Sequence, residues 1–227
     1  MTSTIFSADG QHEWINSFDP RKRVLRGRSY VFVKRLMDLS LVLLSAPFWI
    51  PLLVVLALII RVTSPGAPAM FTQLRTGKGG RRFKMYKFRS MVPNAEALKE
   101  KYAHLNELQW PDFKITNDPR ITKVGRILRK TSLDEIPQLI NVLKDEMSLV
   151  GPRPTSFGAE TYKLWHTERL DVMPGLTGLW QIIGRAQLEF DDRLRLDIAY
   201  IERACVWFDI NILFHTIAAV FKQRGAH

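Results

Sequence analysis

The sequence contains few residues that could cross-link the chain or bind a soft metal. Cys205 is the only cysteine among 227 residues, which excludes an internal disulfide and any C-x-x-C metal motif. Acidic residues are also scarce, because 22 Asp and Glu stand against 33 Lys and Arg and leave a formal net charge of +11. This composition suits a reducing compartment and an anionic partner: nucleic acid, an anionic lipid leaflet or a phosphorylated substrate.

Common catalytic signatures are missing as well. The sequence has no G-x-G-x-x-G, G-x-x-x-x-G-K-[ST], H-E-x-x-H, G-x-S-x-G or D-x-D motif. Its five histidines, at positions 12, 104, 166, 215 and 227, lack the spacing of metal ligands. The residues therefore give no support to a dinucleotide-binding protein, a P-loop NTPase, a zinc protease or a serine hydrolase.

What the sequence does contain is a long apolar segment. The 22 residues from Leu39 to Ile60 carry no charge, enough for roughly 33 Å of helix and thus for a membrane segment. The segment begins too far from the N-terminus for a signal peptide, so we expect it to be retained. Pro47 and Pro51 should break or sharply bend the helix, and Ser45 can bond a carbonyl that the break frees. We place the membrane hinge at Ser45 and Pro47.

Basic residues flank the apolar segment on both sides. Because Lys and Arg mark the cytoplasmic side of a membrane, two basic flanks favour a re-entrant helix-break-helix that enters and leaves one leaflet. A kinked helix that crosses the membrane once is the alternative. The flanking charges are Arg21, Lys22, Arg23, Arg26, Arg28, Lys34 and Arg35 before the segment, and Arg61, Arg75, Lys78, Arg81, Arg82, Lys84, Lys87 and Arg89 after it.

The rest of the chain predicts a mostly helical α+β fold. Aromatic residues in partial alternation over residues 81–91 are typical of a strand, residues 95–108 resemble a polar helix, and Gly and Pro mark loops at 151–154 and 174–178. Apolar residues at helical spacing over 206–221 fit an amphipathic helix at the membrane interface and a core-facing helix equally well.

These segments give three predicted parts. Residues 1–33 form a basic leader, of which we expect residues 1–29 to be mobile or bound to a surface. Residues 34–63 form the re-entrant anchor, and residues 64–227 form a small cytoplasmic catalytic domain with interfacial amphipathic helices, including the C-terminal one.

Two adjacent acids, Asp134 and Glu135, lie where helix-start signals converge. Ser132 and Glu135 match the S-x-x-E capping box, while Asp134 is itself a good N-cap and is our preference, because Pro137 then lies where its missing donor costs nothing. Helix-end donors favour the ionised carboxylates by roughly 0.3 to 1 kcal/mol. An ionised aspartate can be a nucleophile, and carboxylates suit Mg²⁺ that shares its coordination with phosphates. A simple helix cap is the competing interpretation.

Basic residues surround this pair in the sequence. Arg129 and Lys130 precede the acids, and Arg153 follows them in the loop G-P-R-P. Arginine suits bidentate recognition of phosphate, whereas a lone basic residue is usually a solvated surface charge. Taken together, the acids and the arginines predict a phosphate site.

These residues resemble the bacterial sugar transferase family, the monotopic phosphoglycosyl transferases that begin polyprenol-linked glycan assembly. The resemblance extends from Lys34 to about Val220 and keeps the family order throughout. The matching segments are KRLMD (34–38), SPG (64–66), FTQLRTG (71–77), KFRSM (87–91), DPRITKVGRILRKTSLDEIPQLINVLKDEMSLVGPRP (118–154), PGLTGLWQIIGR (174–185) and RLRLDIAYI (193–201).

The resemblance implies transfer of a phospho-sugar from a UDP-sugar to undecaprenyl (polyprenyl) phosphate, with release of UMP and with Mg²⁺ as cofactor. The reaction would take place at the cytoplasmic face of the bacterial inner membrane, with the protein held in one leaflet of anionic lipid. Asp134 would form a covalent aspartyl phospho-sugar. Glu135 would assist it, by binding the metal with it or by removing a proton from the acceptor.

The resemblance also assigns the basic residues. Arg129 would hold phosphate, Arg153 would bind the nucleotide diphosphate, and Lys87 and Arg89 of KFRSM are further candidates for binding phosphate or nucleotide. Asp145 stands where the family usually has glycine, and Ala186 where it commonly has asparagine.

Some points of organisation remain open in the sequence. About 30 residues precede Lys34, so we expect this chain to lack the additional spans and accessory domain of larger members. A second copy of the chain is a candidate partner, and the sugar is not specified by these motifs. A non-catalytic basic membrane adaptor is the alternative function, whereas the apolar segment argues against a nucleic-acid-binding protein.

Overall fold

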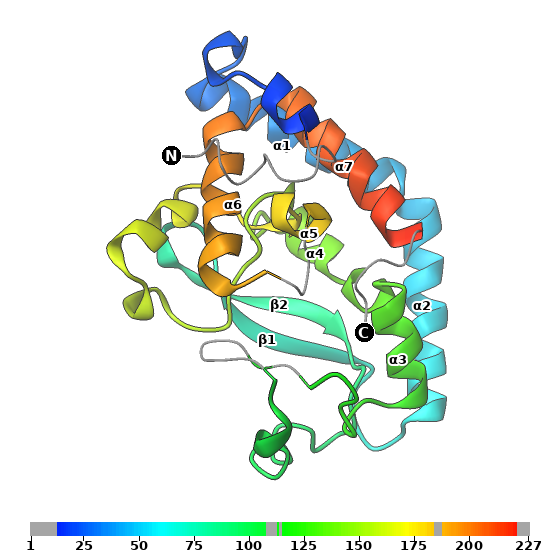
Figure 1. Ribbon diagram of the computed structural model, residues 1–227. Helices are drawn as coiled ribbons and strands as arrows, with labels where there is room; N and C mark the ends of the chain where they lie inside the picture. The colour runs from blue at the N-terminus through cyan, green and yellow to red at the C-terminus, as the bar shows by residue number, and fades with distance from the viewer. Residues whose placement is uncertain (1–12, 108–112, 114, 184–187, 222–227) are drawn as a thin grey trace.

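The computed structural model describes residues 13–107, 113, 115–183 and 188–221, and it confirms a mostly helical α+β fold (Figure 1). The helices are α1 (Gly27–Leu44), α2 (Ala46–Thr63), α3 (Lys123–Lys130), α4 (Gln138–Leu143), α5 (Leu179–Ile183), α6 (Phe190–Arg203) and α7 (Val206–Phe221). The strands are β1 (Met70–Thr76), β2 (Arg82–Phe88), β3 (Ser148–Val150) and β4 (Gly175–Thr177). β1 and β2 form an antiparallel pair, and β3 and β4 a parallel pair.

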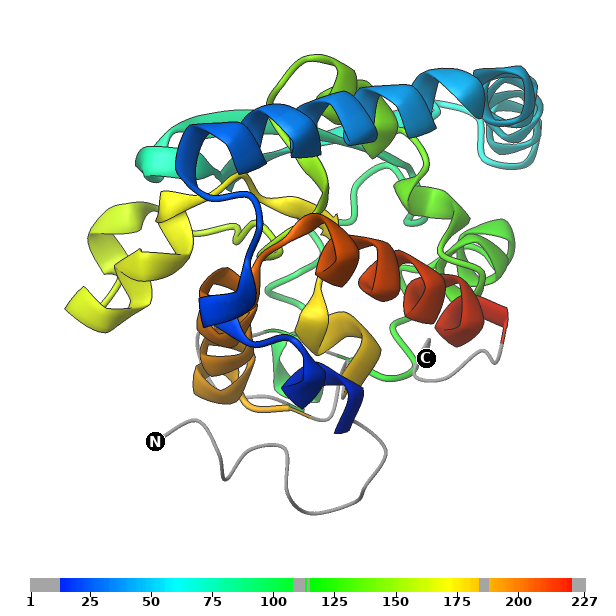
Figure 2. The same ribbon diagram turned by 90° about the horizontal axis from the view of Figure 1, so that it is seen from above.

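The predicted break in the apolar segment occurs at Ser45, between α1 and α2. The Ser45 hydroxyl donates to the carbonyl of Leu41 at 2.6 Å, and the Trp49 indole donates to that of Val42 at 3.0 Å. Pro47 lies in the first turn of α2, where its missing donor costs nothing. The break expected at Pro51 is wrong, because Pro51 lies inside α2 and the helix continues past it. Figure 2 shows α2 turning sharply away from the end of α1.

The helix α2 turns almost all of its apolar surface outward. By length and composition it could cross a membrane, with a mean hydropathy of 2.1, and only 6 % of it is buried in the protein. Its inward face contributes Leu56 and Ile60, which pack with Phe88 of β2 and Leu128 of α3. A helix that places such a surface in water would be exceptional, so α2 needs an apolar environment.

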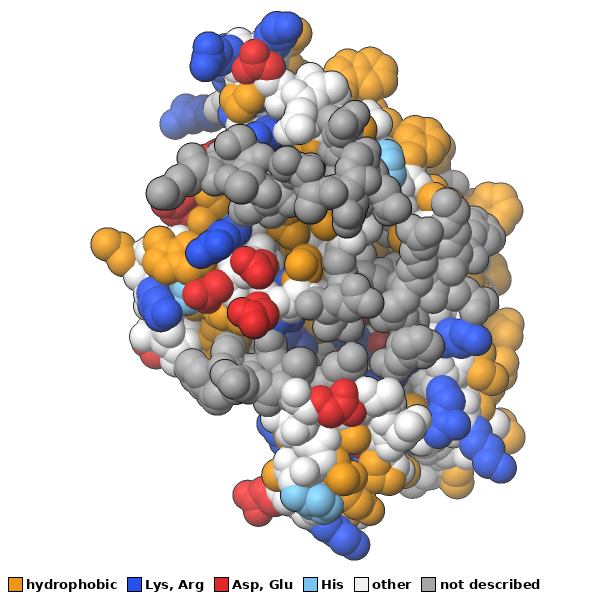
Figure 3. Space-filling view, in the orientation of Figure 1, with side chains coloured by type: hydrophobic (Ala, Val, Ile, Leu, Met, Phe, Trp, Pro, Cys, Tyr) orange, Lys and Arg blue, Asp and Glu red, His pale blue; other side chains and the backbone are white. Residues whose placement is uncertain are grey.

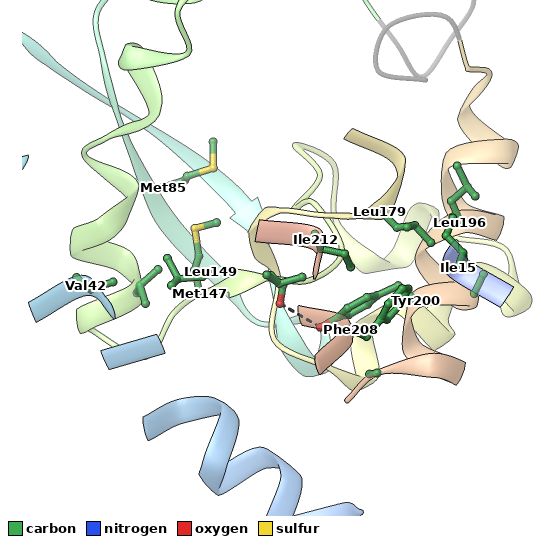
Figure 4. Close-up of a cluster of buried hydrophobic side chains, with 14 residues drawn as sticks. Ile15, Val42, Met85, Met147, Leu149, Leu179, Leu196, Tyr200, Phe208 and Ile212 are labelled. Atoms are coloured by element: carbon green, nitrogen blue, oxygen red, sulfur yellow. Dashed lines mark hydrogen bonds between the residues drawn. The ribbon is translucent and has the colours of Figure 1, made fainter. Parts of the chain in front are cut away.

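The main core lies between α1, α6, α7 and the β3–β4 pair (Figure 4). Phe208 and Ile212 of α7 and Tyr200 of α6 are fully or almost fully buried there, and the Tyr200 hydroxyl donates to the carbonyl of Val150 at 3.3 Å. Ile15 is also fully buried in this core. The expectation of a mobile or surface-bound leader is therefore wrong for the turn at Glu13–Ser17, while residues 1–12 lie outside the described residues.

The helix α7 has one face in the core, as predicted, and a second apolar face that is exposed. Phe208 and Ile212 face the core, whereas Trp207, Phe214 and Ile217 are more than half exposed. Figure 3 shows hydrophobic side chains gathered along the edge of the molecule formed by α2 and α7. Helix α1 adds to the exposed apolar surface through Phe32 and Leu44, which are 71 % and 76 % exposed.

Two other sequence expectations meet the structure differently. The strand predicted over residues 81–91 is confirmed as β2, but the polar helix predicted over 95–108 is wrong, because its described part forms turns and one short 3₁₀ turn at Ala103–Leu105. Arg120 donates to the carbonyl of Ala95 at 3.1 Å, so a tertiary contact uses a carbonyl that a helix would need.

The departure at Asp145 has a backbone explanation. Its φ of 60° lies in the left-handed region that favours glycine, the residue that the resemblance implies at this position. Aspartate is one of the few other residues that tolerate this conformation, and its carboxylate pairs with Arg35 at 3.2 Å. The other departure, Ala186, lies outside the described residues.

Candidate functional site

The Asp134–Glu135 pair lies in a short 3₁₀ turn, Leu133–Glu135, between α3 and α4. The turn is reached through Ser132, whose φ of 57° is left-handed and whose side chain makes no capping bond. The helix α4 begins only at Gln138, after Pro137, and neither carboxylate caps it. The predicted helix cap is therefore wrong, because the left-handed Ser132 turns the chain before a helix can start. The acids are thus available for other contacts.

Glu135 is held by two cations from different parts of the chain. Lys87 of β2 places its Nζ 2.8 Å from Oε1 of Glu135. Arg153 donates through Nη1 to Oε2 at 3.1 Å and through Nη2 to Oε1. Burial alone would raise the pKa of Glu135, but Arg153 and Lys87 outweigh burial and hold the pKa well below its usual range. Glu135 therefore remains ionised under all physiological conditions.

Asp134 has a different environment although it is the adjacent residue. It is 8 % exposed, and the nearest cation, Lys87, lies 4.0 Å from its Oδ2. Burial raises the pKa of Asp134 above its ordinary value, and the Glu135 charge adds to this, while Lys87, Arg129 and Arg153 oppose it. The pKa values of the two acids are thus pushed apart, an arrangement typical of carboxylates with different chemical roles.

Arg129 reaches the site because α3 packs closely against the chain after β2. A Cβ on Gly125 of α3 would lie 1.9 Å from the backbone oxygen of Ser90, so only glycine allows this approach. One turn later the Nε of Arg129 donates to the Ser90 hydroxyl at 2.8 Å. Its charge lies close enough to Asp134 to lower the pKa of that carboxyl.

Arg153 is positioned by the β3–β4 pair. Its loop continues from β3, and a Cβ on Gly175 of β4 would lie 2.1 Å from the backbone nitrogen of Gly151. The two Gly- and Pro-rich loops predicted from the sequence therefore meet, and their contact directs Arg153 toward Glu135. Besides Glu135, Arg153 donates to the carbonyl of Leu176 at 3.4 Å.

Arg89, also predicted for the site, is tied to the end of α2. Its Nη2 donates to the carbonyl of Ser64, just after α2. Within the described chain its Nε and Nη1 are buried without a partner. The structure thus brings Lys87, Arg129 and Arg153 around the acids and places Arg89 between the same cleft and the end of α2.

These residues line an open cleft of about 1020 Å³. Nine Lys or Arg and four Asp or Glu side chains belong to its described lining, so the cleft favours anions. Arg75 of β1 is one of these cations and was missed as a site residue, because in the sequence it is one of fifteen basic residues that flank the apolar segment. The alternation of β1 was the available signal: Phe71, Gln73 and Arg75 share a strand face, and all three line the cleft.

The acids also bear on the predicted Mg²⁺ site. Among the described residues there is no cluster of three or more His, Cys, Asp or Glu that could hold a metal ion. Both oxygens of Glu135 are engaged by Lys87 and Arg153, which leaves Asp134 as the carboxylate with acceptor capacity. The donor set fits Mg²⁺ of the kind that takes one or two carboxylates and completes its shell with water and substrate phosphate.

Several known proteins are similar in sequence to most of this chain. The chain is 45 % identical over 208 residues to an undecaprenyl-phosphate galactose phosphotransferase of Salmonella typhimurium, covering 89 % of this chain and 43 % of that protein. It is 42 % identical over 200 residues to the galactosyl transferase CpsE of Streptococcus agalactiae, covering 87 % and 44 %. It is 36 % identical over 199 residues to the exopolysaccharide production protein ExoY of Rhizobium meliloti, covering 86 % and 88 %.

The chain thus spans less than half the length of the first two relatives and most of the third. A family model described as bacterial sugar transferase matches residues 29–223, which include both acids, all the cations around them and the hinge. The chain therefore belongs to the bacterial sugar transferase family.

Proposed function

We propose that this protein transfers a phospho-sugar from a UDP-sugar to undecaprenyl (polyprenyl) phosphate and releases UMP, as the first membrane step of glycan assembly. The single observation that carries the proposal is the carboxylate pair: Asp134, buried with a raised pKa, lies beside Glu135, which is fully paired. The family relationship supports the substrate classes, since one relative is named an undecaprenyl-phosphate galactose phosphotransferase.

In the first step of this mechanism, Asp134 attacks the sugar-proximal phosphorus. A carboxylate oxygen of Asp134 forms a bond to phosphorus, the bond from phosphorus to the bridging oxygen breaks, and UMP leaves with the electron pair. The product is an aspartyl phospho-sugar. Burial removes solvating water from Asp134, and the cations around it favour its ionised form and draw in the diphosphate.

In the second step, an oxygen of polyprenyl phosphate attacks the same phosphorus. A new phosphoanhydride bond forms, the bond to Asp134 breaks, and the carboxylate is regenerated as polyprenyl diphosphate sugar departs. Glu135 is a weak base because its pKa is held low. We therefore assign Glu135 to holding Lys87 and Arg153 in position, rather than to removing a proton from the acceptor.

Mg²⁺ belongs to the proposal as the cofactor. Asp134, with Glu135 beside it, would hold the ion together with diphosphate oxygens. Bound there, the ion would neutralise charge that develops on the phosphates. The side chains would still do the positioning: Arg129 on the transferred phosphate and Arg153 on the nucleotide diphosphate.

The membrane arrangement is the remaining part of the proposal. We place α1 and α2 in one leaflet of the bacterial inner membrane as a re-entrant pair, with the cleft on the cytoplasmic face. Three observations support it: the break at Ser45, the outward apolar surface of α2 and the exposed Trp207 and Phe214 of α7. This geometry would keep Asp134 near the lipid headgroups, where a soluble donor and a lipid acceptor can reach it in turn.

The proposed reaction is tested by UMP release. Purified protein in lipid discs, with Mg²⁺ and polyprenyl phosphate, is assayed against a panel of UDP-sugars. We expect release with at least one sugar, and loss of more than about 1000-fold in turnover for Asp134→Asn, because an amide cannot form the covalent intermediate. If Asp134→Asn kept full turnover, Asp134 would not be the nucleophile. If the wild-type protein released no UMP from any UDP-sugar, the non-catalytic membrane adaptor would be favoured instead.

A further inference from the structure

Two arginines of the β1–β2 hairpin hold the loop that carries Arg153. Arg75 of β1 donates through Nη1 to the carbonyl of Pro154 at 3.2 Å. Arg82 of β2 donates through Nη2 to the carbonyl of Ser156 at 3.0 Å and through Nη1 to that of Phe157 at 2.9 Å. Both side chains therefore stabilise the loop, but only Arg75 also lines the cleft.

The contacts of Arg75 leave its buried Nε without an acceptor within the described chain. Its Nη2 donates to Oε1 of Gln73 at 2.6 Å, while its Nε is buried and makes no hydrogen bond within the described chain. A buried charged donor without an acceptor destabilises the folded protein, so an unpaired Nε beside a cleft calls for an explanation. A ligand oxygen would supply the missing acceptor.

The electrostatics of Arg75 indicate the charge of that ligand. Burial, and after it the like charge of Arg153, lower the pKa of Arg75 to about 10, while Glu135 acts in the opposite direction. Two guanidinium groups thus lie close together with one carboxylate to balance them. A phosphate bound between the two arginines would relieve this repulsion and could accept hydrogen bonds from both.

The position of Arg75 relative to Asp134 indicates which phosphate fits. Contacts run from Glu135, adjacent to Asp134, to Arg153, then along the chain to Pro154 and from its carbonyl to Arg75. Arg129 is held by a separate contact, from its Nε to the Ser90 hydroxyl at 2.8 Å, and is not part of this series. In an in-line displacement the leaving group lies on the far side of the transferred phosphorus from the nucleophile.

We infer that Arg75, oriented by Gln73 and by the Pro154 carbonyl, binds the phosphate of the leaving nucleoside monophosphate together with Arg153. The inference rests on the proposed function for the identity of the ligand. It assigns Arg75 to binding the nucleotide phosphate rather than the phosphate that is transferred. Arg75 then stabilises the charge that UMP gains as the phosphoanhydride bond breaks.

The experiment measures binding of UMP to the full-length protein in lipid discs by titration calorimetry. The variants are Arg75→Gln, which removes the charge, Arg75→Lys, which keeps it, and Arg82→Gln as the matched control. We expect UMP affinity to fall roughly 10- to 100-fold in Arg75→Gln, because a charge-assisted bond is lost. It should fall less in Arg75→Lys and stay within about twofold of wild type in Arg82→Gln. Thermal midpoints recorded alongside identify any variant that fails to fold.

Two results would overturn the subsite. One is UMP affinity in a folded Arg75→Gln protein within about twofold of wild type; the other is an equal loss in Arg82→Gln, which would mean that both arginines act only by holding the loop. Binding needs no turnover, so the proposed reaction is judged separately. Arg75-dependent UMP binding by a wild-type protein that releases no UMP would support the subsite and reject the transfer reaction.

Discussion

Replacing each acid of the pair by its amide should change stability in opposite directions. In the folded protein Glu135 has a depressed pKa because Arg153 and Lys87 outweigh burial. Its charge therefore stabilises the fold at neutral pH, and Glu135→Gln should lower the free energy of unfolding. Asp134 has a raised pKa because of burial. Its charge therefore destabilises the fold at neutral pH, and Asp134→Asn should raise the free energy of unfolding.

The size of the Glu135 effect follows from its contacts. Removing one partner of a buried ion pair costs about 3 to 5 kcal/mol. The side chains of Glu135, Lys87 and Arg153 keep exposures of 19, 20 and 21 %, and glutamine retains one acceptor oxygen. We therefore expect the lower end of the range, about 3 kcal/mol. In a chain of this length that loss lowers the thermal midpoint by about 6 to 12 °C.

Thermal unfolding in lipid discs, followed by tryptophan fluorescence at pH 7 and near pH 4, provides the measurement. The stability deficit of Glu135→Gln should narrow as pH falls below 4.5, the ordinary pKa of Glu, because the unfolded wild-type chain then takes up a proton at Glu135 while the folded protein stays ionised. The gain of Asp134→Asn should vanish as wild-type Asp134 becomes protonated in both folded and unfolded states. Glu96→Gln is the control, since Glu96 is 90 % exposed in its pair with Lys99 and should change little.

Certain outcomes would refute this reasoning. A Glu135→Gln protein that unfolds at the wild-type temperature would mean that its cations find other partners or water at no cost. An Asp134→Asn protein destabilised as much as Glu135→Gln would mean that the two carboxylates share one environment. The expected pattern, a more stable protein without activity, would separate the catalytic role of Asp134 from any role in folding.

Two further predictions concern pH and topology. UMP release should fall on acidification at a pH above the ordinary aspartate value of 3.8, because Asp134 must be ionised and its pKa is raised; a pH–rate profile that stays flat down to pH 4 would contradict this. In a Cys205→Ser background, Arg28→Cys and Thr63→Cys should both react with an impermeant thiol reagent from the cytoplasmic side of membrane vesicles, because a re-entrant pair returns to the face it entered. Labelling of the two positions from opposite sides would establish a single span instead.

Local pattern was enough where one physical constraint dominates. The uncharged run from Leu39 to Ile60 can hardly be anything but an apolar helical segment, and a proline cannot sit in mid-helix without losing a bond. The break at Ser45 and the apolar face of α2 follow from these constraints. The alternation in residues 81–91 likewise specified β2, because a strand has one side-chain period.

Local pattern failed where tertiary contacts outweighed weak preferences. The cap at Asp134 was a sound choice by propensity, but the left-handed Ser132 and the start of α4 at Gln138 override it. Residues 95–108 have the composition of a polar helix. Arg120, however, donates to the carbonyl of Ala95, which a helix would use for its own hydrogen bonds. Caps and polar helices contribute about 1 kcal/mol or less per residue, so single distant contacts can decide them.

The sequence alone predicted the long apolar helical segment, its break at Ser45 and the gathering of Asp134, Glu135, Arg129 and Arg153 in one cleft. Charge, apolar length and proline act over a few neighbouring residues, so they can be read along the chain. Only the tertiary structure decided how the two acids differ and that Arg75 joins them. A pKa depends on burial and on charges that arrive from distant strands and loops, and neither is present until the chain has folded.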